Sequence, residues 1–242
     1  EWAAHRDRLA RTCETLGMPG AAPADLRGRI DATLDRNDCG DAYVRVSVTR
    51  GVQPGKLTPD PEVDPTVVVI VKPLPRGGVN SKSVWDGPAT VRTVDRRRIP
   101  EASVPAAAKT HNYLNGILAR LDLRGTDADE SLVRDLDGWV AEGATSNVFF
   151  VTDGRLLTPS LDGPILPGVT RTVVMDLADE LGVPVETGQY EVSDVREADE
   201  VFLTNSTWEV RPVATVDGTQ VGGGPVTDRL AQAFDRRVEA CY

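Results

Sequence analysis

The order of strand and helix patterns along the chain is the feature that most constrains its fold. Two helical patterns come first, over residues 2–17 and 24–34, and strand patterns follow at 42–48 and 66–71. Beyond them we predict strands at 89–94, 131–135, 139–141, 147–151, 156–158, 184–190, 200–204 and 210–216, and helices at 112–121, 168–181 and 226–240. Because these patterns mix irregularly and do not alternate as in a doubly wound sheet, the sequence predicts an α+β fold.

A stretch rich in Pro, Gly and Ser divides the chain. Residues 73–88 lack the period of either a helix or a strand, so we interpret them as the link between two domains. A chain of 242 residues is long enough for two small hydrophobic cores. We therefore expect a small N-terminal α/β domain over residues 1–80 and a larger domain over residues 81–242, with a mixed sheet and helices.

The charge balance argues against two kinds of partner. The chain has 37 acidic and 27 basic side chains, a formal net charge of −10. Nucleic acid and anionic membranes both attract basic surfaces, so we expect neither as a partner. No apolar run reaches the roughly 18 residues of a membrane span. Cys13, Cys39 and Cys241 form neither a zinc pattern nor a disulfide framework, which indicates the cytoplasm.

Lysine is scarce, so each one can be judged by its surroundings. Lys56 lies in a polar loop, Lys72 at a strand end and Lys82 in the linker, and all three suit solvated charges. Lys109 follows three alanines and precedes Tyr113 by four positions. Small neighbours suit an amine that points into a pocket, where a desolvated lysine becomes a nucleophile towards aldehydes. The alternative is an ordinary lysine at the edge of a helix.

Two further features suit a binding site. Glu142 stands among small residues before an apolar strand, so we expect it to be partly buried and paired with a cation. The run 96–98 of three arginines, by contrast, is interpreted as a solvated strand end. Gly168, Val169 and Thr170 begin an amphipathic helix, where free amides and a hydroxyl can bind an anion. Many helices begin in this way.

A hydroxyl cluster that includes Ser206 and Thr207 follows an apolar strand, a pattern that is also typical of a turn or cap. A lysine, a buried acid, an anion site and a hydroxyl loop are together the parts needed to hold pyridoxal 5′-phosphate. In their order and in the residues that surround them, these parts resemble the class IV aminotransferase family (fold type IV pyridoxal-phosphate enzymes), and the resemblance runs from residue 1 to about residue 238. The signature of the resemblance lies in residues 139–171 and includes Glu142, Asn147, Phe149, Thr158, Gly168 and Arg171.

The resemblance implies roles for residues of the larger domain. Lys109 would form the internal aldimine with the cofactor and then shuttle protons. Glu142 would pair with the pyridine nitrogen and keep it protonated, so that the ring can accept electrons. Val169 and Thr170 would bind the phosphate. Ser206 and Thr207 match positions that contact the phosphate or the substrate carboxylate, with Thr207 as a substrate-binding residue.

Three more residues take roles from the resemblance alone. Arg8 matches the phosphate-binding arginine of the family, although its own surroundings suggest a surface charge. Tyr113 matches a tyrosine near the phenolic oxygen of the cofactor. Arg45 matches a position that can meet a substrate carboxylate, and the alternative for it is a solvated strand residue. The family also implies a homodimer that acts on a small amine or amino acid.

The beginning of the sequence departs from the family pattern. Family members carry further residues before the helix that holds Arg8, and this sequence starts inside that region, at Glu1. If those residues are missing, the small domain lacks its first strands and part of the substrate pocket.

The choice of reaction depends on shorter motifs. The Arg-x-His carboxylate trap of D-amino-acid transaminases is absent from residues 49–57. Residues 110–113 (Thr-His-Asn-Tyr) and 205–207 (Asn-Ser-Thr) resemble aminodeoxychorismate lyases, whereas residues 224–227 resemble branched-chain transaminases. These motifs favour a 4-amino-4-deoxychorismate lyase, which releases pyruvate and 4-aminobenzoate in folate biosynthesis. The alternatives are a branched-chain transaminase that uses 2-oxoglutarate, and an inactive truncated homologue that binds the cofactor.

Overall fold

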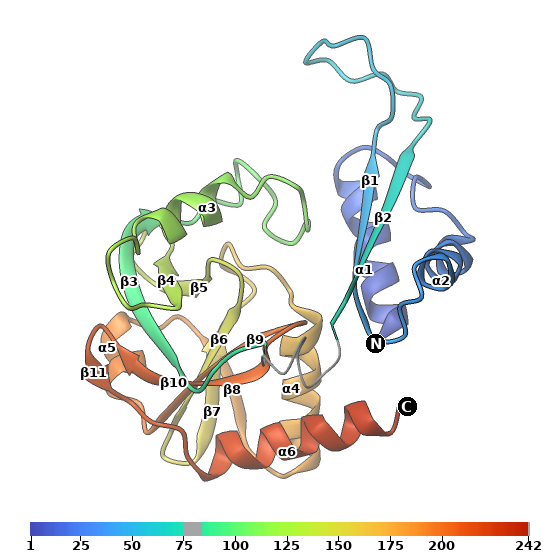
Figure 1. Cartoon of the computed structure of the whole chain (residues 1–242). Coiled ribbons are helices and arrows are strands. Elements are labelled where there is room, and N and C mark those ends of the chain that lie inside the picture. The colour runs from blue at the N-terminus through green and yellow to red at the C-terminus, as the bar shows by residue number, and fades with distance from the viewer. Residues whose placement is uncertain (75–83, 242) are drawn as a thin grey trace. The chain divides into compact units, whose positions relative to one another are not determined.

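The computed structural model describes residues 1–74 and 84–241 (Figure 1). These residues form two compact units, Glu1–Asp86 and Gly87–Tyr242. The predicted domain boundary between residues 80 and 81 lies outside the described residues, as does Lys82. Each unit is therefore described by itself.

The first unit consists of two helices and a β-hairpin. Its elements are α1 (Trp2–Thr15), α2 (Leu26–Arg36), β1 (Ala42–Thr49) and β2 (Thr66–Pro73). The two strands pair antiparallel, with Ala42 opposite Pro73 and Thr49 opposite Thr66. Cys13 and Met18 are buried in a small core, against which Leu9, Leu16 and Val48 pack. Hydrophobic residues at helical spacing on α1 thus contact one face of the hairpin.

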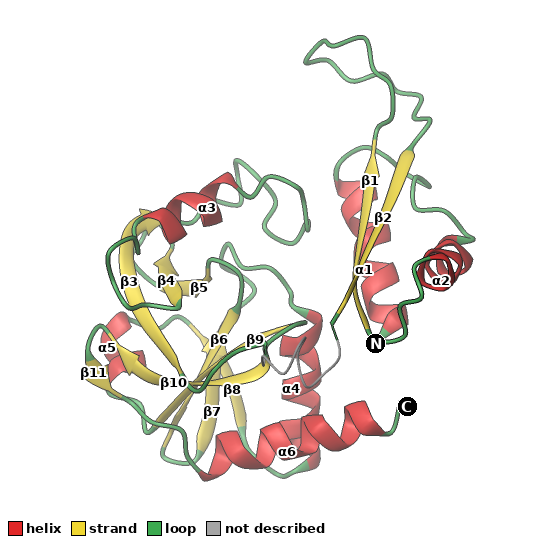
Figure 2. Ribbon diagram, in the orientation of Figure 1, coloured by secondary structure: helices red, strands yellow, loops and turns green. Residues whose placement is uncertain are grey.

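The second unit is built on a curled mixed sheet (Figure 2). Its strands are β3 (Ala89–Arg97), β4 (Glu130–Arg134), β5 (Val140–Gly143), β6 (Asn147–Thr152), β7 (Arg155–Pro159), β8 (Val185–Gly188), β9 (Glu200–Asn205), β10 (Glu209–Val216) and β11 (Thr219–Gln220). They are ordered β5-β4-β3-β10-β9-β6-β7-β8, with β11 paired to β10. The pairs β10–β3, β3–β4 and β7–β8 are parallel and the others antiparallel.

Helices cover this sheet. They are α3 (Leu114–Leu121), α4 (Val169–Glu180), α5 (Val192–Arg196) and α6 (Pro225–Glu239). Alternate residues of β6 enter different cores, because successive side chains of a strand point to opposite faces. Phe149 packs with α4 and α6 residues, whereas Phe150 packs in a cluster that includes Val195 of α5. Burial of both faces explains why residues 147–151 read as an unbroken apolar run.

The α+β class is confirmed, and the predicted elements are present with shifted ends. The strand predicted at 139–141 extends to Gly143, so Glu142 belongs to β5 itself. The sequence did not predict α5 or β11, which have five and two residues and are too short to show a period. Within the described ranges, no helix is both long and apolar enough to cross a membrane.

Candidate active site

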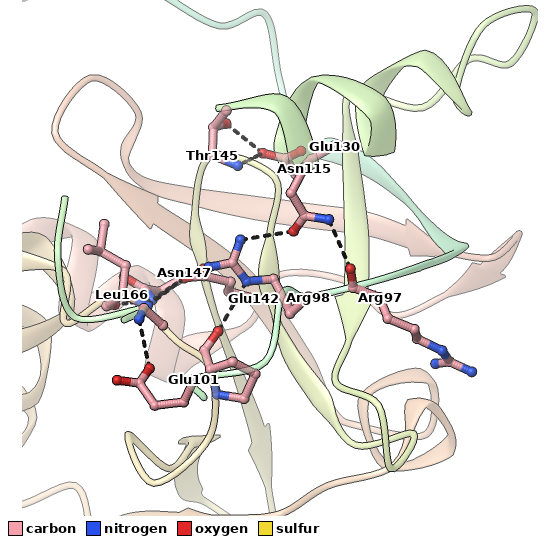
Figure 3. Close-up of polar contacts among 11 residues, drawn as sticks. Arg97, Arg98, Glu101, Asn115, Glu130, Glu142, Thr145, Asn147 and Leu166 are labelled. Atoms are coloured by element: carbon pink, nitrogen blue, oxygen red, sulfur yellow. Dashed lines mark hydrogen bonds and ion pairs between the residues drawn. The ribbon is translucent and has the colours of Figure 1, made fainter. Parts of the chain in front are cut away.

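Glu142 is the buried centre of the candidate site, with an exposed fraction of 6%. Its Oε1 lies 2.9 Å from Nη2 of Arg98, and its Oε2 accepts the backbone N–H of Leu166 at 3.1 Å. The side-chain amide of Asn147 approaches the same Oε2 at 3.4 Å (Figure 3). Both expectations for Glu142, burial and a cationic partner, are met.

Arg98 is the partner that the sequence did not identify. Its guanidinium donates to the carbonyl of Pro164 at 3.1 Å and to Oδ1 of Asn115 at 3.3 Å, in addition to its ion pair with Glu142. Asn115 is held in turn, because its amide donates to the carbonyl of Arg97 at 2.9 Å. The interpretation of the arginine run as solvated is therefore wrong for Arg98. A buried carboxylate requires a cation, and this requirement outweighs the tendency of arginine to face water.

Burial raises the pKa of Glu142 from its ordinary 4.5 to about 7, because the charged form loses its hydration. The positive charge of Arg98, the N–H of Leu166 and the charge of Lys109 act in the opposite direction, while the charge of Glu130 adds to the rise. Two consequences follow. Glu142 can change its protonation near neutral pH, and Lys109 lies close enough for its charge to act on Glu142.

Lys109 itself is exposed. The expected desolvation of its amine is therefore not found in this structure. The segment ahead of it is fixed, because Oε2 of Glu101 accepts the N–H of Ala106 at 2.7 Å and Ala108 is buried. Lys109 thus stands on an anchored segment, close enough to the buried Glu142 for its charge to act on that carboxylate.

The first turn of α4 begins close to Glu142 and has no side-chain cap. Its N-cap is Gly168, which has no side chain to satisfy the first helical N–H groups. A Cβ at Gly168 would lie 2.1 Å from Oδ1 of Asn147, so the close approach of the two segments requires glycine. Val169 and Thr170 follow, and Thr170 is buried. The helix dipole and the uncapped amides favour a bound anion at this point.

Two buried polar atoms near this helix lack hydrogen-bond partners in the described part of the chain. One is Nε of Arg171, whose pKa is lowered by burial, and the other is Oγ1 of Thr204. Nη2 of Arg171 donates to the carbonyl of Pro159 at 3.1 Å. Buried polar groups in proteins are almost always satisfied, so these two atoms suit contact with a polar ligand.

The hydroxyl cluster is a tight turn between β9 and β10. Oδ1 of Asn205 accepts the N–H and the hydroxyl of Thr207, both at 3.0 Å, and the N–H of Trp208 at 2.7 Å. Ser206 is exposed at the tip. The amide of Asn205 also reaches the carbonyl of Thr145 at 3.4 Å, which ties this turn to the segment between Glu142 and Asn147.

The other predicted residues lie elsewhere. Tyr113 is the N-cap of α3, 46% exposed, with its ring edge-on to His111. Arg8 is buried in the first unit, where its Nη2 lies 3.5 Å from Nδ1 of His5, so it is not the surface charge suggested by its surroundings. Arg45 is exposed on β1, opposite Ile70. The site above is built from residues of the second unit alone.

Known proteins resemble this chain over most of its length. The family model for amino-transferase class IV matches residues 1–216. A putative branched-chain-amino-acid aminotransferase of Methanocaldococcus jannaschii is 34% identical over 236 residues, which cover 95% of this chain and 79% of that protein. A D-alanine aminotransferase of Listeria innocua is 32% identical over 245 residues, 98% of this chain and 82% of that protein.

Solved structures agree. The branched-chain amino acid aminotransferase from Thermobaculum terrenum, in its PLP-bound holo-form, superposes with a TM-score of 0.88 at 28% identity, covering 98% of this chain and 78% of that one. The curled sheet and the buried site thus define a fold type IV enzyme. The chain belongs to the class IV aminotransferase family, whose cofactor is pyridoxal 5′-phosphate.

The residues present fit this cofactor. Its pyridine nitrogen needs a buried acid, and the second unit offers Glu142. Its aldehyde needs an amine, which Lys109 offers, and its phosphate needs uncapped amides, which the first turn of α4 offers. Among the residues that the structure describes, no group of three or more His, Cys, Asp or Glu side chains is placed to hold a metal ion. The family membership makes the protein a pyridoxal-phosphate enzyme.

Proposed function

We propose that the protein is a branched-chain amino acid transaminase, which transfers the amino group of leucine, isoleucine or valine to 2-oxoglutarate. The observation that carries this proposal is the agreement of sequence and structure comparisons. Relatives named as branched-chain aminotransferases match 95% of the chain, and solved structures with that name superpose with TM-scores of 0.85 to 0.88. This support favours transamination over the lyase reaction that the short motifs suggested.

In this proposal Lys109 is the catalytic residue. Bound pyridoxal 5′-phosphate would supply an electron sink for the pair of electrons left when a proton leaves the substrate. Nζ of Lys109 would hold the cofactor until the amine of the substrate displaces it, and would then take the proton from Cα of the amino acid and deliver it to C4′ of the cofactor, so it serves as both nucleophile and base. Its exposure leaves it accessible for both roles.

Glu142 would hold a proton at the pyridine nitrogen. Its position supports this role, because a buried carboxylate is stabilised by a cationic neighbour. Arg98 and the N–H of Leu166 hold the carboxylate in place. Val169 and Thr170 would bind the phosphate with their amides and hydroxyl. Tyr113 would lie near the phenolic oxygen.

Residues outside this centre complete the proposal. Ser206 would bind the phosphate, and Thr207 the phosphate or the substrate carboxylate. Arg8 would be a further phosphate ligand, and Arg45 would bind the substrate carboxylate. We also propose a homodimer, as the family resemblance implies.

A substrate panel tests the reaction. Purified protein with pyridoxal 5′-phosphate is mixed, in separate reactions, with L-leucine, D-alanine and 4-amino-4-deoxychorismate, and the cofactor absorbance is followed together with the products. We expect L-leucine to convert the cofactor to its amine form with release of the 2-oxo acid. Subsequent 2-oxoglutarate should restore the original spectrum.

Other outcomes have distinct meanings. Release of 4-aminobenzoate without response to L-leucine would support the lyase reaction and contradict the proposal. A response to D-alanine alone would place the chain with the D-amino-acid transaminases, despite the absent Arg-x-His trap. The matched controls are Lys109→Ala, which should respond to nothing, and Lys56→Ala, an exposed loop lysine whose loss should change nothing.

A further inference from the structure

A second buried glutamate stands beside the site. Glu130, the first residue of β4, has an exposed fraction of 0%. Its Oε2 accepts the N–H of Thr145 at 3.1 Å and the hydroxyl of Thr145 at 2.6 Å (Figure 3). The same oxygen accepts the hydroxyl of Ser146 at 3.2 Å. Its Oε1 accepts the N–H of Ser131 at 2.9 Å and lies 3.3 Å from Nη1 of Arg120. A carboxylate with this many donors is fixed in one orientation.

Strand register explains why Glu130 reaches this segment. In the antiparallel pair β4–β5, Leu132 lies opposite Gly143 and Val133 opposite Glu142. Continuing the same register by two residues places Glu130 across from Thr145, just beyond the end of β5. The side chain of Glu130 therefore binds the residues that follow the last backbone pairing of β4 with β5.

The braced segment is the turn formed by residues 143–146. It joins β5, at one edge of the sheet order, to β6, which pairs with β9 and β7. The N–H of Gly143 donates to the carbonyl of Ser146 at 2.7 Å and closes the turn. A Cβ at Gly143 would lie 2.3 Å from Oγ of Ser146 and 3.0 Å from Cγ of Glu130, so the turn and the glutamate are packed directly together.

Both ends of this turn enter the active site. Glu142 immediately precedes Gly143, and Asn147, which follows Ser146, contacts Glu142 and the carbonyl of Leu166. The middle of the turn also contacts the turn between β9 and β10 that contains Ser206, because the carbonyl of Thr145 accepts the amide of Asn205 at 3.4 Å. Residues 143–146 are therefore linked to the acid, to its amide neighbour and to the Ser206 turn.

We propose that Glu130 is a positioning residue of the cofactor site: it braces the 143–146 turn and thereby sets the position of the Glu142 carboxylate. Nothing in the geometry requires Glu130 to touch cofactor or substrate. Its charge is near enough to add to the rise in the pKa of Glu142, which agrees with the short path between the two carboxylates. The inference depends on the proposed role of Glu142 at the pyridine nitrogen.

A double-mutant cycle on the full-length protein tests the inference. The affinity of the cofactor-free protein for pyridoxal 5′-phosphate is measured by absorbance titration for wild type, Glu130→Gln, Glu142→Gln and the double variant. We expect Glu130→Gln to weaken binding about tenfold or more, which corresponds to about 1.4 kcal/mol. In the Glu142→Gln background the same substitution should change affinity less than about twofold, because its effect passes through Glu142.

Two matched comparisons separate positioning from general stability. Glu200 is also buried and accepts the N–H and hydroxyl of Thr227 at 2.7 and 2.6 Å, but it pairs with Val151, at the far end of β9 from Thr204. Glu200→Gln should lower the melting temperature and leave cofactor affinity unchanged within about twofold. If Glu130→Gln does not fold, a second pair of variants replaces it. Thr145→Val removes the hydroxyl that donates to Glu130, and Thr145→Ser retains it. The valine variant should weaken binding, and the serine variant should not.

The outcomes are distinguishable. An equal loss of affinity from Glu130→Gln in both backgrounds, or no loss in either, overturns the positioning role. Unchanged affinity and spectrum in Glu142→Gln alone would instead overturn the proposed role of Glu142. In the holoenzyme, the pH midpoint of the cofactor absorbance should move in Glu130→Gln and stay fixed in Glu200→Gln, a difference that a purely structural role would not produce.

Discussion

The raised pKa of Glu142 should make the stability of the protein depend on pH. In the unfolded chain the carboxyl has its ordinary pKa near 4.5, and in the folded chain burial raises the pKa to about 7. The folded state therefore binds the proton more tightly than the unfolded state. The contribution to stability is fully present below pH 4.5 and is lost as the pH rises through about 7.

The size of the effect follows from the same pKa difference. One pKa unit corresponds to about 1.4 kcal/mol, so a rise from 4.5 to about 7 amounts to about 3 kcal/mol in all. Most of this loss should occur between pH 5 and pH 8. Glu142→Gln cannot ionise at this position, so the variant should lose correspondingly less stability over the same interval.

Urea unfolding of the cofactor-free protein, measured at several pH values between 5 and 8, gives the comparison. The difference between wild type and Glu142→Gln removes the contribution of the other titrating groups. We expect wild type to lose about 2–3 kcal/mol more than the variant as the pH rises. Parallel pH profiles for the two proteins, or a wild type that gains stability relative to the variant, would refute the burial argument.

Two glycine substitutions extend the test to other parts of the chain. Gly168→Ala puts a Cβ 2.1 Å from Oδ1 of Asn147, and should weaken binding of pyridoxal 5′-phosphate about tenfold in an absorbance titration; unchanged affinity would contradict the anion site at α4. Gly51 has a φ of +74°, and a Cβ there would lie 1.9 Å from the carbonyl oxygen of Asp64. Gly51→Ala should cost about 3 kcal/mol in thermal or urea unfolding, whereas Gly55→Ala, at φ +72° with open space around it, should cost about 1 kcal/mol; equal losses would contradict the steric explanation.

The fold could be predicted where a pattern is long enough to show a period. The apolar run in residues 147–151 predicted β6, and the periodic residues of α4 predicted that helix within two residues at each end. The short α5 and β11 offered no such signal. The order of strands in the sheet depends on long-range pairing, such as β3 beside β10, and no local pattern contains it.

The candidate site, too, could be predicted from the sequence only in part. Small and apolar neighbours predicted the burial of Glu142, and the need of a buried acid for a cation was also clear from the sequence. The identity of that cation was not, because Arg98 is 44 residues earlier (142 − 98) and stands in a charged run. Glu130 stands near Asp127 and Asp129 in an acidic stretch, and only the register of β4 against β5 shows that it faces inward.

The assignment of Lys109 is the central claim, and chemical trapping tests it most directly. Borohydride reduction of the holoenzyme fixes the cofactor to the lysine that holds it, and peptide mass spectrometry then identifies that lysine among the four in the chain. The account predicts a pyridoxyl group on the peptide that contains Lys109 and none on peptides with Lys56, Lys72 or Lys82. A label on any of those three, with Lys109 unmodified, would contradict it.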